Sequence, residues 1–116
     1  MLYGEILNLA DVLYPNEYSK EEKLSWIKEV NADVIKNIEK REAPSEPVTE
    51  EDASLISAPY EDMYKFYIMA QIAYYQRDWA AYDAHMAHYA ARRDDYMAYY
   101  IRTYGGKTAR FRGWIY

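Results

Sequence analysis

The fold of this chain depends most on the stretch "YEDMYKFYIMAQIAYYQRDWAAYDAHMAHY", residues Tyr60–Tyr89. Its first part, as far as Gln76, is apolar on nearly every side, which is typical of a helix surrounded by protein. Asp78 is a favourable N-cap, so a new helix is expected to begin at Trp79. Because the break at Arg77 and Asp78 is short, these two helices are predicted to form an antiparallel hairpin.

Three further sequence signals predict where the helices begin and end. The helix after Asp78 is expected to end at Gly105, and Pro59 suits the first position of the helix before it. Ser19 and Glu22 have the spacing of a capping box, which marks the start of an earlier helix. The sequence therefore predicts an all-α fold, a small bundle of about four helices with a C-terminal antiparallel helical hairpin and an extended basic tail; the helices span approximately 3–13, 20–41, 60–76 and 79–104.

The 116 residues suit one domain. Residues 1–104 are interpreted as a single helical domain with a linker at 43–58, and residues 105–116 as a C-terminal basic and aromatic tail. Prolines, serines and acids prevent a continuous helix in the linker, although Thr49–Leu55 can form one helical turn. The linker is open to two interpretations, a loop that reaches a neighbouring molecule and a plain surface connection.

Composition narrows the class of protein. The chain has no cysteine, which excludes disulfides and thiolate metal sites. We expect no secretory signal, because no basic region precedes an apolar run at the start, and no membrane span, because the apolar stretches are short. The net charge of −5 argues against a general nucleic-acid binder. This charge is uneven, since residues 105–116 carry +3 and the rest of the chain −8.

The last predicted helix has an aromatic face with Arg93 at its centre. Eleven of the fifteen tyrosines lie between Tyr60 and Tyr104, and they could serve as core, as a stacking platform for bases or sugars, or as a surface for another protein. Core packing is favoured, because the neighbouring apolar helix needs a partner and the nearby acids oppose base stacking. The face comprises Trp79, Tyr82, Met86, Tyr89, Tyr96, Tyr100 and Tyr104.

The opposite side of the same helix carries a stripe of alanines, interrupted by Asp94. Alanine has the best helix propensity, so a solvent-facing stripe is possible, but a solvated face usually carries more charge. We therefore expect a second buried surface here, such as a contact with another subunit. Trp26 lies off the apolar stripe of its own helix and packs either on the first helix or on another molecule. The predicted interface residues are Ala80, Ala84, Ala87, Ala91 and Trp26, with Lys107, Arg110, Phe111, Arg112 and Trp114 in the tail; Ala98 continues the stripe.

The sequence offers little chemistry for catalysis. His85 and His88 are spaced closely enough on a helix to share a metal, but a third ligand is not apparent, so they are weak metal candidates. No phosphate-binding glycine loop, nucleophile motif or acid–base constellation is present. Arg93 is expected to pair with a carboxylate or stack on a ring. We therefore expect no enzyme, no catalytic residue and no cofactor.

Three stretches of the sequence resemble a known family. "YPNEYSKEEKLSWIKEV" (Tyr14–Val30) is similar to the N-terminal motif of small proteins encoded in tailed phages and prophages of Gram-positive bacteria. "APYEDMYKFYIMAQIAYYQRDWAAYDAHMAHY" and "DDYMAYYIRTY" resemble the C-terminal hairpin of the same proteins. The resemblance covers most of residues 8–104. These proteins are head–tail connectors, or head-completion adaptors, of siphophages.

The resemblance implies a structural virion protein without a catalytic residue. Its copies would form a homo-oligomeric ring between the portal protein and the downstream neck and tail proteins. The ring would continue the DNA channel without sequence-specific binding, in the virion neck and in the host cytoplasm during assembly, with no membrane contact. The linker 43–58 and the tail 105–116 would contact neighbours. Two alternatives stay open, a non-enzymatic helical interaction module of a prophage and an accessory nucleic-acid-binding protein that uses the basic tail.

Overall fold

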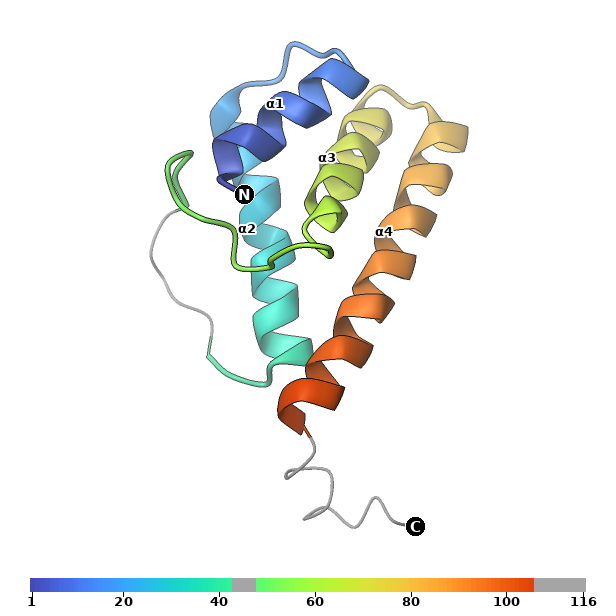
Figure 1. Ribbon diagram of the computed structural model, residues 1–116. Coiled ribbons are helices and arrows are strands. Elements are labelled where there is room, and N and C mark those ends of the chain that lie inside the picture. The colour runs from blue at the N-terminus through green and yellow to red at the C-terminus, as the bar shows by residue number, and fades with distance from the viewer. Residues whose placement is uncertain (43–47, 106–116) are drawn as a thin grey trace.

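The computed structural model describes residues 1–42 and 48–105, which fold into a bundle of four α-helices (Figure 1). Helices α2 and α4 each continue into a short π-helical segment, η1 and η2. The described residues contain no β-strand and only an isolated bridge between Leu2 and Ala53. The predicted all-α bundle is thereby confirmed. Its elements are α1 (Tyr3–Leu13), α2 (Lys20–Asp33), η1 (Val34–Ile38), α3 (Asp62–Tyr75), α4 (Trp79–Tyr100) and η2 (Ile101–Gly105).

The predicted starts of α2 and α4 are confirmed by their caps. The side chain of Ser19 accepts a hydrogen bond from the Glu22 N–H at 3.2 Å, and Asp78 Oδ1 accepts one from the Ala81 N–H at the same distance. Each bond satisfies a backbone donor that a helix start leaves free.

Two predicted boundaries were wrong. Helix α3 begins at Asp62 rather than near Pro59, because the chain first makes a turn in which the Tyr60 N–H donates to Ser57 O at 3.0 Å. The helix expected over 20–41 ends at Ile38, since Lys40 has a left-handed φ of 56°. Beyond it the Arg41 N–H donates back to Ile35 O at 3.1 Å, a bond of the kind that closes helix C-termini.

Helix α3 is the centre of the bundle, because it contacts α1, α2 and α4 (Figure 1). Its side chains are buried in several directions, as the apolar pattern predicted. Helix α1 lies on one side of α3 and α4 lies antiparallel to α3 on the other, which confirms the hairpin. The fully buried residues of α3 are Met63, Tyr64, Ile68, Ala70, Ile72 and Ala73.

The second half of the predicted linker belongs to the packed protomer. Ile56 is completely buried, and backbone groups of this segment bond to the start of α1. The Tyr3 N–H donates to Asp52 O and the Gly4 N–H to Glu50 O, both at 3.0 Å, so the loop caps α1. A Cβ at position 4 would lie 3.3 Å from Glu50, so glycine permits this close approach. Residues 48–58 are therefore not a free linker, while 43–47 lie outside the described residues.

Within this segment, the turn expected over Thr49–Leu55 is a single tight turn and not a helix. The Asp52 N–H donates to Thr49 O at 3.2 Å, and the Thr49 N–H donates to Asp52 Oδ2 at 2.9 Å. These reciprocal bonds close the turn locally.

A buried polar network holds three parts of the fold together. Asn31 of α2 donates to the Tyr3 hydroxyl of α1 at 2.8 Å and accepts from the Tyr64 hydroxyl of α3 at 2.6 Å. The two hydroxyls in turn accept the backbone N–H groups of Leu55 and Ile56 at 2.9 and 3.2 Å. Burial raises the pKa of Tyr64, so its hydroxyl keeps the proton that it donates to Asn31.

We predict that Asn31→Ala lowers the free energy of unfolding by about 2–4 kcal/mol, because it leaves a buried hydroxyl donor unpaired and opens a cavity. Urea unfolding followed by circular dichroism measures the change. Asn8→Ala, at an exposed position of α1, is the control and should shift stability by no more than about 0.5 kcal/mol. Equal effects of the two substitutions would contradict a structural role for the network.

Candidate functional site

Helix α4 uses one face to build the protomer. Tyr89 and Tyr96 are buried, with Tyr89 against Tyr67 of α3 at a ring-centroid distance of 5.0 Å. The Tyr96 hydroxyl donates to Glu39 at 3.2 Å, which connects α4 to the end of η1. Core packing, the interpretation favoured for the aromatic face, therefore holds for its middle. Tyr82, Met86 and Tyr100 on the same face are half-buried.

The two ends of the aromatic face were predicted wrongly. Trp79 is 53% exposed and Tyr104 is 62% exposed. Both lie at the ends of the last helix, where few neighbouring elements cover it. Trp79 meets Tyr74 edge-on at 5.5 Å, and the Tyr104 ring lies 4.9 Å from that of its helical neighbour Tyr100. The exposed ring of Trp79 joins those of Tyr74 and Tyr75 at the tip of the hairpin.

Arg93 pairs with a carboxylate, one of the two outcomes expected for it. Its Nε lies 2.6 Å from Asp33 Oδ2, and its second nitrogen donates to Oδ1 at 3.3 Å, so the contact is bidentate. Partial burial raises the pKa of Asp33, but the hydrogen bonds from Arg93 and Asn37 outweigh this and hold the pKa below its usual value. The pair joins α4 to α2 across the bundle.

The opposite face of α4 is open to solvent. All five alanines of the predicted stripe are exposed, and so is Asp94, which interrupts it. The first four alanines of the stripe extend over about three turns of helix, and the exposed Asp83 lies at the edge of the stripe, one turn before Ala87. The protomer leaves this face uncovered over its described residues. The stripe comprises Ala80, Ala84, Ala87, Ala91 and Ala98.

The prediction that Trp26 belongs to an interface was wrong, because its side chain is buried within the chain. It is only 5% exposed, because its ring stacks on Tyr75 at 6.0 Å and meets Tyr18 edge-on at 5.9 Å. Its position off the apolar stripe of α2 reflects these two aromatic partners, which come from the α1–α2 connection and from the end of α3. The predicted tail contacts at Lys107, Arg110, Phe111, Arg112 and Trp114 lie outside the described residues.

The two weak metal candidates contact aromatic rings. His88 stacks on Phe66 with ring centroids 5.1 Å apart, and His85 lies 5.8 Å from Tyr14. Burial, and then the neighbouring His88, lower the pKa of His85, so this ring is mostly neutral at pH 7. Within the part of the chain that the structure describes, no cluster of three metal-binding side chains occurs. These contacts support packing rather than metal binding.

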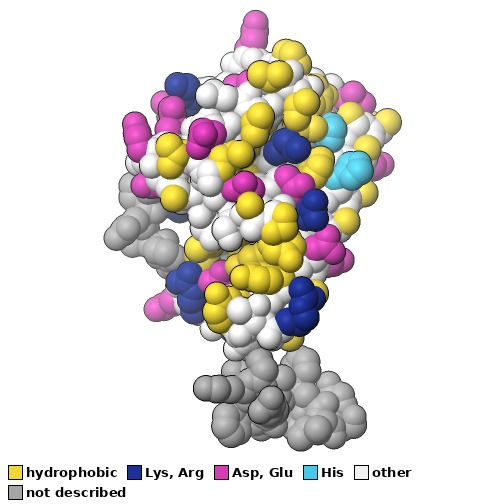
Figure 2. All heavy atoms as spheres, viewed as in Figure 1, with side chains coloured by type: hydrophobic (Ala, Val, Ile, Leu, Met, Phe, Trp, Pro, Cys, Tyr) yellow, Lys and Arg dark blue, Asp and Glu magenta, His cyan; other side chains and the backbone are white. Residues whose placement is uncertain are grey.

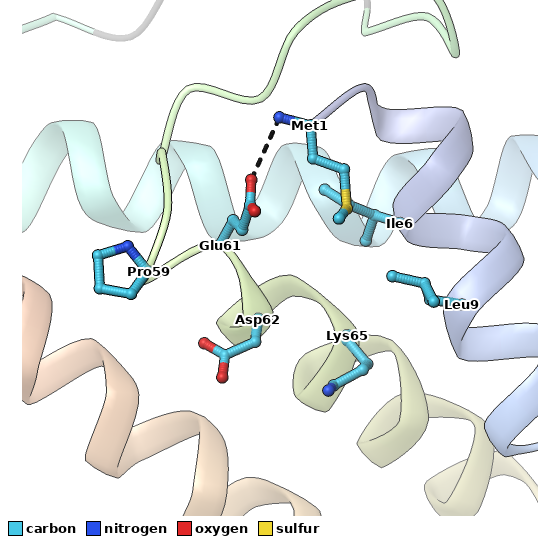
Figure 3. A pocket seen from close by; sticks show the side chains of 7 residues that line it. All are labelled: Met1, Ile6, Leu9, Pro59, Glu61, Asp62 and Lys65. Carbon is cyan, nitrogen blue, oxygen red and sulfur yellow. Dashed lines mark ion pairs between the residues drawn. The ribbon is translucent and has the colours of Figure 1, made fainter.

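A small pocket of about 140 Å³ opens between α1 and the start of α3 (Figure 3). The two carboxylates that line the pocket, Glu61 and Asp62, each have a cationic partner. Glu61 pairs with the Met1 amino group at 3.2 Å, and Arg92 Nε lies 2.9 Å from Asp62 Oδ1. That oxygen is buried without a well-aligned hydrogen bond, yet the short contact with Arg92 neutralises its charge. The lining residues are Met1, Ile6, Leu9, Pro59, Glu61, Asp62 and Lys65.

The structure also exposes aliphatic side chains that the sequence analysis did not select. Leu9, Val12 and Leu13 of α1 face solvent, with Leu9 at the pocket, and hydrophobic side chains are visible on the surface around α1 (Figure 2). The available signal was the width of the apolar pattern in residues 3–13, which exceeds one buried face. Among the described residues, this surface and the alanine stripe of α4 are open apolar helix faces, in addition to the exposed rings at the tip of the hairpin.

No protein-family model matches the chain, and neither a curated protein nor a solved structure was found to match it. Among the described residues, no helix is both long and apolar enough to span a bilayer.

We predict that Arg93→Met lowers the free energy of unfolding by about 1 kcal/mol at pH 7. Since the pKa of Asp33 is lowered in the folded state, the pair stabilises the fold above the usual aspartate pKa of about 3.9 and loses this contribution as the pH falls through the folded value. The difference from the unmodified protein should therefore narrow in acid, measured by urea unfolding at several pH values. Arg102→Met, at an exposed position, is the control. A difference independent of pH would indicate lost packing instead.

Proposed function

We propose that this chain is a non-enzymatic structural protein that assembles with copies of itself through the outer face of α4. The observation that carries this proposal is the exposed alanine stripe on a helix whose opposite face is already used by the protomer core. Small side chains allow another backbone to approach closely, and a solvated helix face normally carries more charge than this one. A second protein surface accounts for both features.

The assembly that fits best is a ring in the neck of a tailed phage, as a head–tail connector between portal and tail. The order of motifs along residues 8–104 supports this assignment through the family resemblance. The acidic body supports it as well, because a channel wall of like charge would let DNA pass without holding it. The corresponding location is the virion neck, with assembly in the host cytoplasm.

A helical interaction module that binds one unrelated protein is the second candidate. The exposed rings of Tyr74, Tyr75 and Trp79 at the hairpin tip favour it, since tyrosine and tryptophan are enriched in the centres of protein interfaces. The two functions differ in what the purified chain binds. The connector associates with itself through α4, whereas the module stays monomeric and requires another protein.

We predict that Ala87→Glu reduces self-association at least tenfold, because it places a charge in the middle of the alanine stripe. Sedimentation velocity over a range of protein concentrations measures the association. Ala32→Glu, an equivalent change at an exposed position of α2 between Lys28 and Lys36, should leave it unchanged. A chain that stays monomeric at the highest soluble concentration, or an Ala87→Glu variant of unchanged mass, would contradict the proposal.

A further inference from the structure

Helix α1 has an apolar stripe beside the side chains that it buries in the core. Residues at 4-3-4 spacing present a continuous stripe to another helix, as in a coiled-coil seam. The second member of the stripe is buried at the edge of the pocket, while the later members are open, with Leu9 45% and Leu13 58% exposed. The stripe consists of Leu2, Ile6, Leu9 and Leu13.

A lysine without an ion-pair partner lies beside this stripe. Lys65 faces the pocket (Figure 3), and no described carboxylate lies within ion-pair distance of its amino group. Its Nζ is 4.8 Å from the centre of the Phe66 ring, which places the charge near an aromatic face. Since Glu61 and Asp62 already have cationic partners, this surface is complementary to an apolar stripe with one acid.

The outer face of α4 is an apolar stripe that contains an acid. The residues of this alanine stripe follow one another at 4-3-4-3-4 spacing, and all are exposed. Asp94 interrupts the stripe and Asp83 lies at its edge, and no lysine or arginine of the described residues forms an ion pair with either carboxylate. The residues are Ala80, Ala84, Ala87, Ala91, Asp94 and Ala98.

We propose that the leucine stripe of α1 and the adjoining pocket bind the alanine stripe of α4 from a second copy of this chain, with Lys65 of one copy opposite Asp94 of the other. Leucine side chains fill the shallow groove that alanines leave, and the lysine and the aspartate each gain the partner that they lack within the protomer. The proposal rests on the function proposed above and specifies which two surfaces of the chain meet.

The two surfaces belong to different helices of the molecule. Helices α1 and α4 flank α3 (Figure 1). A contact between two different surfaces is heterologous, and each added copy leaves one surface of each kind open. Such a contact closes into a ring or continues as a filament, and it does not stop at a symmetric dimer.

Charge reversal tests the pairing of Lys65 with Asp94. Lys65→Asp and Asp94→Lys should each weaken self-association by about tenfold, because each places like charges opposite one another. The double variant should recover most of the loss, which sedimentation velocity can measure. Lys28→Asp combined with Asp94→Lys is the control and should recover nothing, because Lys28 is an exposed residue of α2. Absence of recovery in the Lys65 and Asp94 pair would overturn the pairing.

Disulfide cross-linking tests the two surfaces directly, because the natural chain has no cysteine. The variant with both Leu9→Cys and Ala87→Cys should give a ladder of covalent multimers on oxidation, whereas either single variant should stay monomeric on a denaturing gel. Dimers formed by Ala87→Cys alone would show that α4 pairs with itself, which overturns this inference but leaves the proposed self-assembly intact. If no variant cross-links and the unmodified chain does not associate, the inference and the proposed function both fail.

Discussion

The fold depends on a single asparagine side chain that satisfies two tyrosine hydroxyls in the interior. Asn31 fixes the positions of Tyr3 and Tyr64, and these hydroxyls then hold the backbone of Leu55 and Ile56. Because a buried polar group without a partner is costly, each member restricts where the others can lie. Helices α1, α2 and α3 and the loop before α3 are therefore fixed together, while α4 attaches through α3, the Arg93–Asp33 pair and Tyr96.

The helices differ in how much of their surface is buried within the chain. Helix α3 contacts the other three helices and buries most of its apolar side chains among them, leaving Lys65 and the rings at its C-terminal end accessible. Helices α1 and α4 flank it, and each keeps one apolar face that the protomer does not cover. The buried core does not include those faces, so their apolar character is better explained by contacts outside the chain.

Much of the fold could be predicted, because local signals and the tertiary structure agree. The caps at Ser19 and Asp78 and the apolar period of residues 60–76 determined helices that the structure contains. The boundary at Lys40 and the burial of Ile56 could not be predicted, since they depend on contacts with distant residues. Helical phase alone predicted that the alanine stripe lies opposite the aromatic face. The exposed apolar face of α1 could not be predicted, because the apolar pattern of a helix does not show which of its apolar residues are buried within the chain.

The position of α3 between the two open faces links the interior of the protomer to the geometry of any assembly built through them. In a ring joined by α1 and α4, the number of copies depends on the angle between these helices within each subunit. That angle is determined by the side chains packed around α3, including the fully buried Ala70 and Ala73. Copy number would then be encoded in the hydrophobic core rather than at the subunit boundary, and a change of one methyl group there could alter symmetry without touching an interface residue.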